Sequence, residues 1–209
     1  MLNNYFFIDG SALISQVREI QKKTASLKGR RLDVVQLISY FATALNELTE
    51  RQYKRAVFYF PKGEPTVSEY LVIPDFKKPG IIRDLSFKYC GEKLKGSVAF
   101  NNFVSSKVPK KWQGRFTKSE KGIDIEICCD ALRLAGAGKL DRLILLENDD
   151  DFVPLLRILK EFGTNISLVY LSELITPNKS LVTEADSYDV VPLVELERMF
   201  LPIPPNPTI

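Results

Sequence analysis

The sequence predicts an α/β fold in which a parallel sheet is covered by helices on both faces. Short apolar runs rich in β-branched and aromatic residues recur along the chain, and stretches with apolar residues at helical spacing separate them. A strand, a helix and a further strand in succession imply a right-handed crossover, which produces a parallel sheet. With 209 residues and 45% hydrophobic content, the chain can build the core of one such domain.

The first quarter of the chain shows the expected alternation. The run YFFID, residues 5–9, is apolar and ends in an acid, as a buried strand does. Residues 11–21 then carry apolar side chains at helical spacing, and residues 22–31 form a basic, glycine-containing loop. Asp33 stands where it can cap a second helix. The run RAVFYF, residues 55–60, predicts the next strand.

The rest of the chain continues the alternation after a middle segment that is harder to assign. Residues 61–121 are rich in proline, glycine and lysine, and LSFKYC at residues 85–90 is their strongest strand candidate. Beyond them the pattern predicts a helix, a strand, a helix and a strand, at residues 123–136, 142–147, 152–163 and 165–171. The sequence has no internal repeat, so we expect a single domain over residues 1–200, with a basic elaboration at 61–121 and an extended tail at 201–209.

The charge of the chain is unevenly distributed, although its net value is only +3. Residues 77–121 contain 12 basic and 3 acidic residues, whereas residues 122–209 carry a formal charge of −8. Such asymmetry favours a polyanionic partner, although a solvated lysine-rich surface gives the same pattern. Trp112 and Phe116 lie among the basic residues, where their rings would either stack on bases or fold back on the core.

The composition excludes several classes of site. The chain has no histidine, so Ser-His-Asp and Cys-His nucleophiles and most zinc sites are ruled out. Its three cysteines, two of them adjacent at Cys128 and Cys129, do not make a disulfide framework. We expect a reducing cytoplasm and a core position for this pair. No apolar run is long enough for a bilayer and no signal peptide is evident, so no membrane partner is expected.

Acidic residues follow two of the predicted strands. Asp9 ends the first strand, and Asp149 lies just past residues 142–147. The carboxyl ends of parallel strands share one edge of a sheet, so these carboxylates meet in one crevice if their strands are neighbours. Asp124, near the start of a predicted helix, belongs to the same edge. Clustered carboxylates repel one another, and a divalent cation such as Mg²⁺ compensates the repulsion.

The other acids nearby have simpler interpretations. Asp151 precedes a helix and is placed as its N-cap, a role compatible with orienting a metal-bound water. Asp150 is expected to point to solvent. Asp130 lies six residues beyond Asp124, roughly 240° around a helix, so the two do not easily share one site.

Four segments carry motifs whose order and spacing are typical of one family. They read YFFIDGSAL, EKGIDIEICCDAL, LILLENDDDFVPLLRILKEFGTNISLVYL and LVTEADSYDVV. With these motifs the chain resembles the NYN domains, a branch of the PIN-like ribonucleases that includes the LabA group. The resemblance spans nearly the whole chain and is weakest over residues 61–118. It implies a three-layer α/β/α sandwich with a central parallel sheet, and metal-dependent cleavage of RNA with Mg²⁺ or Mn²⁺.

The resemblance also assigns residues, and the chain departs from the family at some positions. It assigns the main acidic positions to Asp9, Asp124, Asp149 and Asp151. Asp130 matches a second acid that the family often has on the same helix as Asp124. The family's asparagine after the first acid is absent, and its Ser-Gly before the acidic turn is replaced by Glu147 and Asn148. We expect Asn148 to tolerate the left-handed conformation of a glycine. Glu147 adds a carboxyl group, either as a further ligand or as a disturbance.

The leading hypothesis is a metal-dependent ribonuclease. Asp9, Asp124 and Asp149 would hold the metal, and Asp151 would orient the attacking water. The RNA backbone would be bound by basic residues, namely Lys107, Lys110, Lys111 and Arg115. Lys121, next to the acids, would either neutralise their repulsion or contact the scissile phosphate.

Two alternatives remain. The change at Glu147 and Asn148 motivates a catalytically inactive module that binds RNA or protein. A phosphatase of the haloacid dehalogenase type would use Asp9 as nucleophile, but Ser11 stands where its second aspartate is needed. The sequence leaves the RNA target and the oligomeric state open, a homo-oligomer included.

Overall fold

The computed structural model describes most of the chain outside its middle segment. The described residues are 3–48, 55–62, 66–73, 85–93, 106–107, 110 and 120–202.

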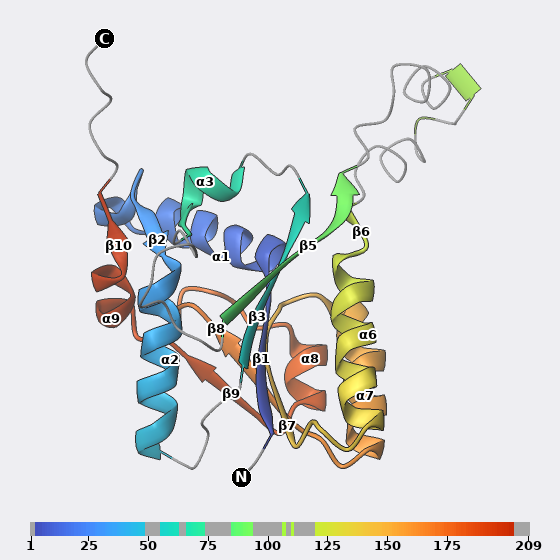
Figure 1. Cartoon of the computed structure of the whole chain (residues 1–209). Helices are drawn as coiled ribbons and strands as arrows, with labels where there is room; N and C mark the ends of the chain where they lie inside the picture. Colours follow the sequence, from blue (N-terminus) through green and yellow to red (C-terminus); the bar gives the residue numbers. More distant parts are fainter. Residues whose placement is uncertain are drawn as a thin grey trace.

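A seven-stranded sheet forms the centre of the molecule (Figure 1). Six of its strands run parallel, and β6 pairs antiparallel with β5 at one edge. In spatial order the strands are β6 (Glu120–Lys121), β5 (Leu85–Lys93), β3 (Arg55–Lys62), β1 (Asn4–Asp9), β7 (Arg142–Leu146), β8 (Asn165–Tyr170) and β9 (Ser187–Val190).

Helices cover both faces of this sheet, which gives the predicted three-layer α/β/α arrangement (Figure 1). One face carries α1 (Gly10–Lys23) and α2 (Val34–Leu48), and the rings of Phe6 on β1 and Phe41 on α2 meet edge to face at 5.1 Å. The other face carries α6 (Ile123–Gly136), α7 (Val153–Glu161) and α8 (Lys179–Glu184). Among the described residues, no helix combines the length and apolarity needed to cross a bilayer.

The central strands are apolar because both of their sides are covered. Phe6, Ile8, Leu143 and Leu145 are all fully buried, although they come from only two strands. Alternation between apolar and polar residues is absent from such strands, and continuous apolar runs replace it. This pattern made β1, β7 and β8 predictable from sequence, and the structure confirms the α/β fold class and the parallel central sheet.

A second, three-stranded sheet lies beside the first and was not predicted. Its order is β10 (Phe200–Leu201), β2 (Arg31–Asp33) and β4 (Leu71–Val72), with α3 (Thr66–Tyr70) and α9 (Leu193–Arg198) nearby in the chain. The expectation of a loop over residues 22–31 is therefore wrong in part. That segment holds the end of α1, the 3₁₀ turn η1 (Ala25–Leu27) and the start of β2. Strands of two or three residues are too short to show a period in sequence.

Some boundaries differ from those expected, and others fall outside the described residues. Strand β3 continues through Pro61 to Lys62, and its pairing with β5 shifts register there, so the missing proline N–H is tolerated. The division into one domain over residues 1–200 with an elaboration at 61–121 stays a prediction, because much of that segment lies outside the described residues. Of the predicted tail at 201–209, only residues 201–202 are described, and Leu201 belongs to β10.

The carboxyl edge of the sheet is where β1 and β7, which are direct neighbours, both end. Helix α1 begins at Gly10, immediately after the last residue of β1. A Cβ at Gly10 would lie 2.2 Å from Cδ1 of Phe60 and 2.7 Å from the carbonyl oxygen of Tyr59. Only glycine therefore fits this turn, which fixes where Asp9 lies relative to β3.

Candidate active site

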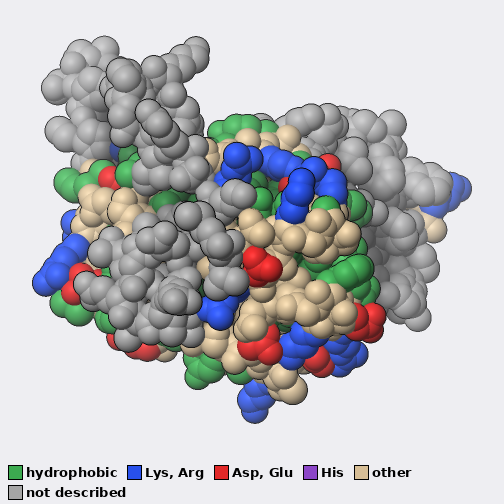
Figure 2. All heavy atoms as spheres, turned by 60° about the horizontal axis from the view of Figure 1, so that its bottom comes forward, with side chains coloured by type: hydrophobic (Ala, Val, Ile, Leu, Met, Phe, Trp, Pro, Cys, Tyr) green, Lys and Arg blue, Asp and Glu red, His purple; other side chains and the backbone are tan. Residues whose placement is uncertain are grey.

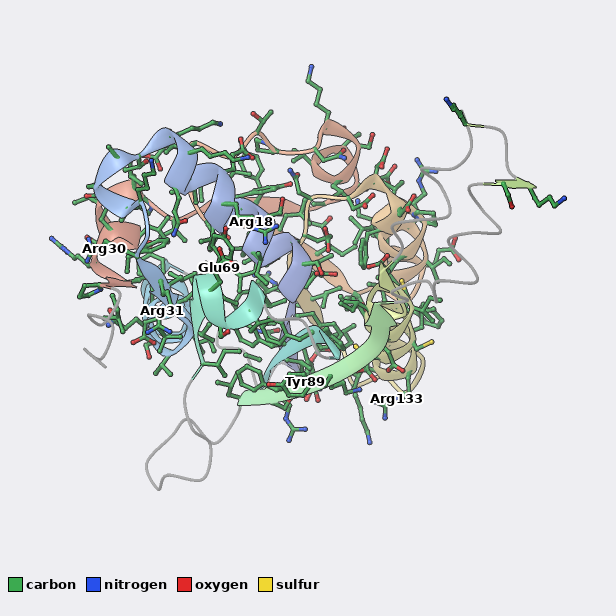
Figure 3. The ribbon with its side chains drawn as sticks, turned by 90° about the horizontal axis from the view of Figure 1, so that it is seen from above. Arg18, Arg30, Arg31, Glu69, Tyr89 and Arg133 are labelled. Atoms are coloured by element: carbon green, nitrogen blue, oxygen red, sulfur yellow. The ribbon has the colours of Figure 1, made fainter. Side chains whose placement is uncertain are left out.

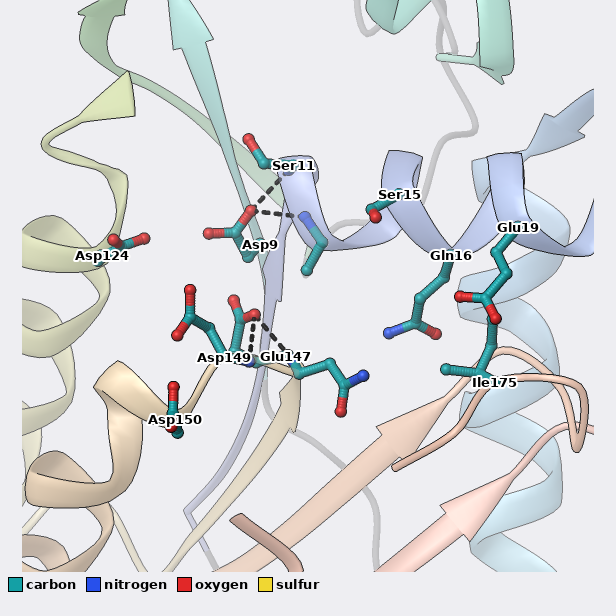
Figure 4. Close-up of a pocket in the computed structure, with 12 residues that line it drawn as sticks. Asp9, Ser11, Ser15, Gln16, Glu19, Asp124, Glu147, Asp149, Asp150 and Ile175 are labelled. Carbon is teal, nitrogen blue, oxygen red and sulfur yellow. Dashed lines mark hydrogen bonds between the residues drawn. The ribbon is translucent and has the colours of Figure 1, made fainter. Parts of the chain in front are cut away.

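A pocket of about 600 Å³ opens at the carboxyl edge beside β1 and β7 (Figure 4). Its acidic side chains come from β1, α1, α6 and the residues that follow β7. They are Asp9, Glu19, Asp124, Glu147, Asp149 and Asp150.

Asp9 is fixed by the start of helix α1. Its Oδ1 accepts hydrogen bonds from the backbone N–H groups of Ser11, at 2.6 Å, and Ala12, at 3.0 Å, so Asp9 is the N-cap of the helix. Only 3% of the residue is exposed. The helix N-terminus carries partial positive charge, which favours a carboxylate there. Figure 4 shows the second oxygen of Asp9 directed across the pocket toward Asp124, which extends from the first turn of α6.

Asp149 is fixed in a similar way by the 3₁₀ turn η2 (Asp150–Phe152). Its Oδ1 accepts a hydrogen bond of 3.0 Å from the backbone N–H of Asp151. Carboxylate oxygens of Asp149, Asp150 and Asp151 all lie within 4.8 Å of one another, and the three side chains are exposed. The structure therefore brings Asp9, Asp124 and Asp149 to one pocket, as the topology of parallel strands predicts.

Residues 86–191, just over half of the 209-residue chain, match the family model of the NYN domain. The match includes Asp124, the acidic turn and strands β5 to β9. The chain belongs to the NYN domain family. The resemblance seen in the sequence motifs is thereby confirmed. Searches of curated proteins and of solved structures each gave no match.

The acidic turn of this NYN domain differs from expectation at Asp151. Asp151 does not cap α7, whose N-cap position is Phe152 with no side-chain hydrogen bond, whereas Asp149 caps the 3₁₀ turn before it. Asp151 is not among the residues lining the pocket, although its carboxylate lies close to Asp149 and Asp150. Asp150 is exposed, as predicted, and also lines the pocket.

Glu147 is buried beneath the other acids, with only 4% of the residue exposed. Its Oε1 accepts hydrogen bonds from the backbone N–H groups of Asn148, at 2.7 Å, and Asp149, at 3.1 Å. Burial, and next the negative charge of Asp9, raise the pKa of Glu147 to about 9, against the effect of the Asn148 N–H. A carboxyl group with this pKa is mainly protonated at neutral pH. Glu147 then shapes the turn without adding a full charge.

Asn148 does not adopt the left-handed conformation expected of it, since every described non-glycine residue has a negative φ. Its side chain instead ties the acidic turn to the loop before α8. Asn148 Nδ2 donates to the carbonyl oxygen of Thr176 at 3.0 Å, and its Oδ1 accepts from the backbone N–H of Asn178 at 2.7 Å. The side-chain contacts of this asparagine therefore hold the turn, at a position where family members commonly have glycine.

Asp130 lies outside the pocket, as its position on the helix predicts. Its carboxylate accepts hydrogen bonds from the Tyr59 hydroxyl at 2.8 Å, from Arg133 at 2.9 Å and from Lys88. Burial alone would raise the pKa of Asp130, but these three hydrogen bonds outweigh it and hold the pKa below its ordinary value. Asp130 therefore anchors α6 to β3 and β5, and this fixes the helix that carries Asp124.

Three arginines of the first third of the chain, Arg18, Arg30 and Arg31, contact the chain itself. Seen from the carboxyl edge, they lie around α1 and the small sheet, on the side away from α6 (Figure 3). The guanidinium of Arg18 lies over the ring of Tyr70, 4.6 Å from its centre. Arg30 donates to the carbonyl oxygen of Phe200, and Arg31 to that of Ser68 at 3.4 Å. These contacts join α1 and β2 to their neighbours and indicate a structural role.

The predicted nucleic-acid contacts are described only in part. Lys107 and Lys110 are exposed. The backbone of Lys121 lies in β6, directly before α6, but its side chain is outside the described residues, as are Lys111, Trp112, Arg115 and Phe116. The face that includes the opposite edge of the sheet carries interspersed basic and acidic side chains (Figure 2).

The cysteines are reduced, and their positions differ from expectation in one case. Cys90, Cys128 and Cys129 are all free thiols. Cys128 is partly buried against the core, but Cys129 is exposed, so the prediction that both are core residues is wrong for Cys129.

A second hollow of about 430 Å³ adjoins the acidic pocket, because Asp150 lines both. It provides two cations, Arg157 and Lys179, together with Ser180 and Thr183. Arg157 forms an ion pair of 2.7 Å with Glu184, which also lines the hollow. This hollow was missed in the sequence, because its residues come from α7 and α8 with no motif to connect them.

Proposed function

We propose that this NYN domain is a ribonuclease that cleaves RNA phosphodiester bonds with Mg²⁺ or Mn²⁺ at the acidic pocket. The observation that carries the proposal is the convergence of Asp9, Asp124 and Asp149 with Glu147 and Asp150 on one pocket. Such convergence opposes folding, because like charges repel, and a bound divalent cation offsets that repulsion. Membership of the NYN family supports the same assignment.

The donor atoms available in the pocket suit a hard cation. The aspartates offer carboxylate oxygens, which Mg²⁺ and Mn²⁺ prefer, and no soft sulfur ligand is among the described residues that line the pocket. Asp9, Asp124 and Asp149 would hold the ion. When bound, such an ion lowers the pKa of a water molecule and stabilises negative charge on the phosphate.

The protein's own residues provide rigidity and proton control. Backbone N–H groups hold one oxygen of Asp9 and one of Asp149, so the orientation of each carboxylate is set by the fold. Asp151, close to Asp149, would orient the attacking water. Water attack forms a new P–O bond while the ester P–O bond breaks; the water gives up a proton to solvent, and the departing ribose oxygen takes up a proton to leave as a hydroxyl group.

The RNA backbone would extend from the acidic pocket over the adjoining hollow. Lys179 is exposed there, and Arg157 lies beside it, so both can contact phosphates. Lys107, Lys110, Lys111, Arg115 and Lys121 would contribute further contacts. Phosphate contacts of this kind are insensitive to sequence and weaken as salt is added.

The test compares RNA cleavage by the wild type, Asp149→Asn and Asp141→Asn. Asparagine is as good a cap as aspartate, so Asp149→Asn removes the charge and keeps the turn. Asp141 is an exposed acid at the opposite edge, where it accepts a hydrogen bond from the backbone N–H of Asn3. We expect labelled RNA to be cleaved with Mg²⁺ or Mn²⁺ by the wild type and Asp141→Asn, and not by Asp149→Asn. Equal cleavage by all three proteins would assign the activity elsewhere.

A second candidate function is RNA binding without cleavage, and the buried Glu147 favours it. Glu147 occupies a place where family members commonly have serine, below Asp9 and beside Asp149 (Figure 4). Isothermal titration with Mn²⁺ distinguishes the two functions. The nuclease binds the ion with a saturable heat of binding, whereas the binding module retains RNA intact and shows no such heat.

A further inference from the structure

The acidic pocket has a second arm, which is lined by uncharged polar and apolar side chains as well as by an acid. Figure 4 shows it on the side away from Asp124. Helix α1 contributes three of its residues and the loop after β8 contributes one, so the arm is defined by Ser15, Gln16, Glu19 and Ile175. Glu147 lies between this arm and the aspartates (Figure 4).

Gln16 is the unusual member of the arm, because it is buried and its amide is half satisfied. Only 4% of the residue is exposed, and its Oε1 accepts a hydrogen bond of 3.0 Å from the backbone N–H of Leu171. That bond fixes which way the amide is turned. The Nε2 group has no hydrogen-bond partner and points into the pocket (Figure 4). Buried donors without a partner are rare, so this one indicates an acceptor that the protein chain itself does not supply.

The other residues of the arm indicate which kind of chemical group would carry that acceptor. Glu19 is acidic, and its ion-pair partner Lys23 is not among the described residues lining the pocket. A phosphate would therefore be repelled from this arm. Ile175 offers an apolar wall and Ser15 a hydroxyl, which together suit a planar group with polar edges. Among the parts of a nucleotide, the base has these properties.

We propose that the second arm binds the base of a nucleotide next to the scissile phosphate, with Gln16 donating its amide N–H to that base. This inference rests on the proposed ribonuclease function. Gln16 and Glu19 are three residues apart and lie on one side of α1. A base that accepts from the Gln16 amide and donates an exocyclic amine to Glu19 satisfies both. Adenine and cytosine carry a ring nitrogen acceptor beside an exocyclic amine, whereas the donor of uracil is a ring imide N–H between two carbonyl groups, and unpaired RNA bases are recognised by edges of this kind.

The first experiment measures binding of short fluorescent oligo(A), oligo(C) and oligo(U) by anisotropy, in EDTA and low salt so that no RNA is cleaved. The variant is Gln16→Met, which keeps the length of the side chain and removes the amide. The matched control is Gln21→Met on the same helix, where Gln21 Nε2 donates to the carbonyl oxygen of Arg30 at 2.6 Å. Gln16→Glu is the second variant, because it retains an acceptor for the Leu171 N–H if loss of that bond prevents folding.

We expect the wild type and Gln21→Met to bind oligo(A) and oligo(C) more tightly than oligo(U). Both Gln16 variants should lose this preference and bind oligo(A) and oligo(C) about fivefold more weakly, as loss of one hydrogen bond predicts. If the Gln16 variants bind all three RNAs as the control does, the inference is overturned and the nuclease proposal stands. If the wild type neither binds nor cleaves RNA, both fail.

A second measurement needs no folded variant. Adenosine, cytidine and uridine carry no phosphate, so they test the base site without repulsion from the acids. Titrated into the ¹⁵N-labelled protein, adenosine and cytidine should shift the side-chain amide resonance of Gln16 and leave that of Gln21 in place. Uridine should shift it less. An unchanged Gln16 resonance with all three nucleosides would contradict the assignment.

Discussion

Replacing Gly10 by alanine would place a methyl group inside the junction of β1, α1 and β3. The new Cβ would lie 2.2 and 2.4 Å from two ring carbons of Phe60 and 2.7 Å from the carbonyl oxygen of Tyr59. Neither neighbour yields easily. The Phe60 ring contacts the rings of Phe58, at 5.9 Å, and Phe87, at 6.0 Å, which also pack on each other, and Tyr59 pairs with Asp9 in the sheet.

The magnitude follows from the cost of overpacking. One excess methyl group in a tight core costs about 1–3 kcal/mol, and the better helix propensity of alanine returns less than about 1 kcal/mol of this. A net loss of about 2 kcal/mol lowers the Tm of a domain of this size by roughly 4–8 °C. Because Gly10 follows Asp9 directly, the same strain should displace that carboxylate and lower RNA cleavage.

The matched control is Gly136→Ala, near the end of α6. A Cβ there would meet nothing within 4 Å, so we expect unchanged or higher stability, by up to about 1 kcal/mol. Thermal and urea denaturation of both variants, with cleavage measured alongside, test the reasoning. A Gly10→Ala protein as stable as Gly136→Ala would show that the turn after β1 adapts, and that its geometry does not fix Asp9.

Three further predictions concern the acids and their supports. Asn148→Ala should lower the free energy of unfolding by about 1–2 kcal/mol in urea, because two hydrogen bonds to the loop before α8 are lost; an unchanged midpoint would mean that the loop is held by other contacts. Asp9→Asn should keep its cap and relieve repulsion, so that Tm in EDTA is unchanged or higher while cleavage is lost; a lower Tm would indicate that the charge itself stabilises the helix. The pKa of Asp130 is lowered on folding, so its stabilisation is complete above the unfolded pKa and declines as pH falls through the folded value. Asp130→Asn should therefore destabilise the protein more at pH 7 than at pH 3, and an equal effect at both would contradict a role for the carboxylate charge.

Sequence predicted the fold where burial leaves a strong pattern. Strands such as β1 and β7 are apolar on both sides, and the position of Asp9 and Asp149 at their ends follows from the chain direction. Sequence alone does not fix the order of strands in a sheet. The prediction that the two acids meet therefore depended on β1 and β7 being neighbours, which the strand order shows. The strands β2, β4 and β10 leave no comparable pattern.

Long-range polar contacts were the part that sequence could not supply. Asn148 contacts Thr176 and Asn178, about thirty residues further along the chain, and nothing local at Asn148 signals them. The raised pKa of Glu147 depends on burial that only the assembled fold produces. Gln16 did leave a signal that was missed, since it falls between Leu13 and Ile20 on the apolar side of a predicted helix, where a polar residue needs a partner.

Two groups of acids in this domain show how the fold separates structural from functional charge. Asp130 is held by a tyrosine hydroxyl and by two cationic side chains, Lys88 and Arg133, which compensate its charge within the protein. Asp9, Glu147 and Asp149 are held by backbone N–H groups, which fix one oxygen of each but contribute no full positive charge. The first arrangement is complete in itself and suits an anchor between α6 and the sheet. The second directs oxygens from separate parts of the chain toward one pocket, and rigidly placed carboxylate oxygens of this kind suit a divalent ion.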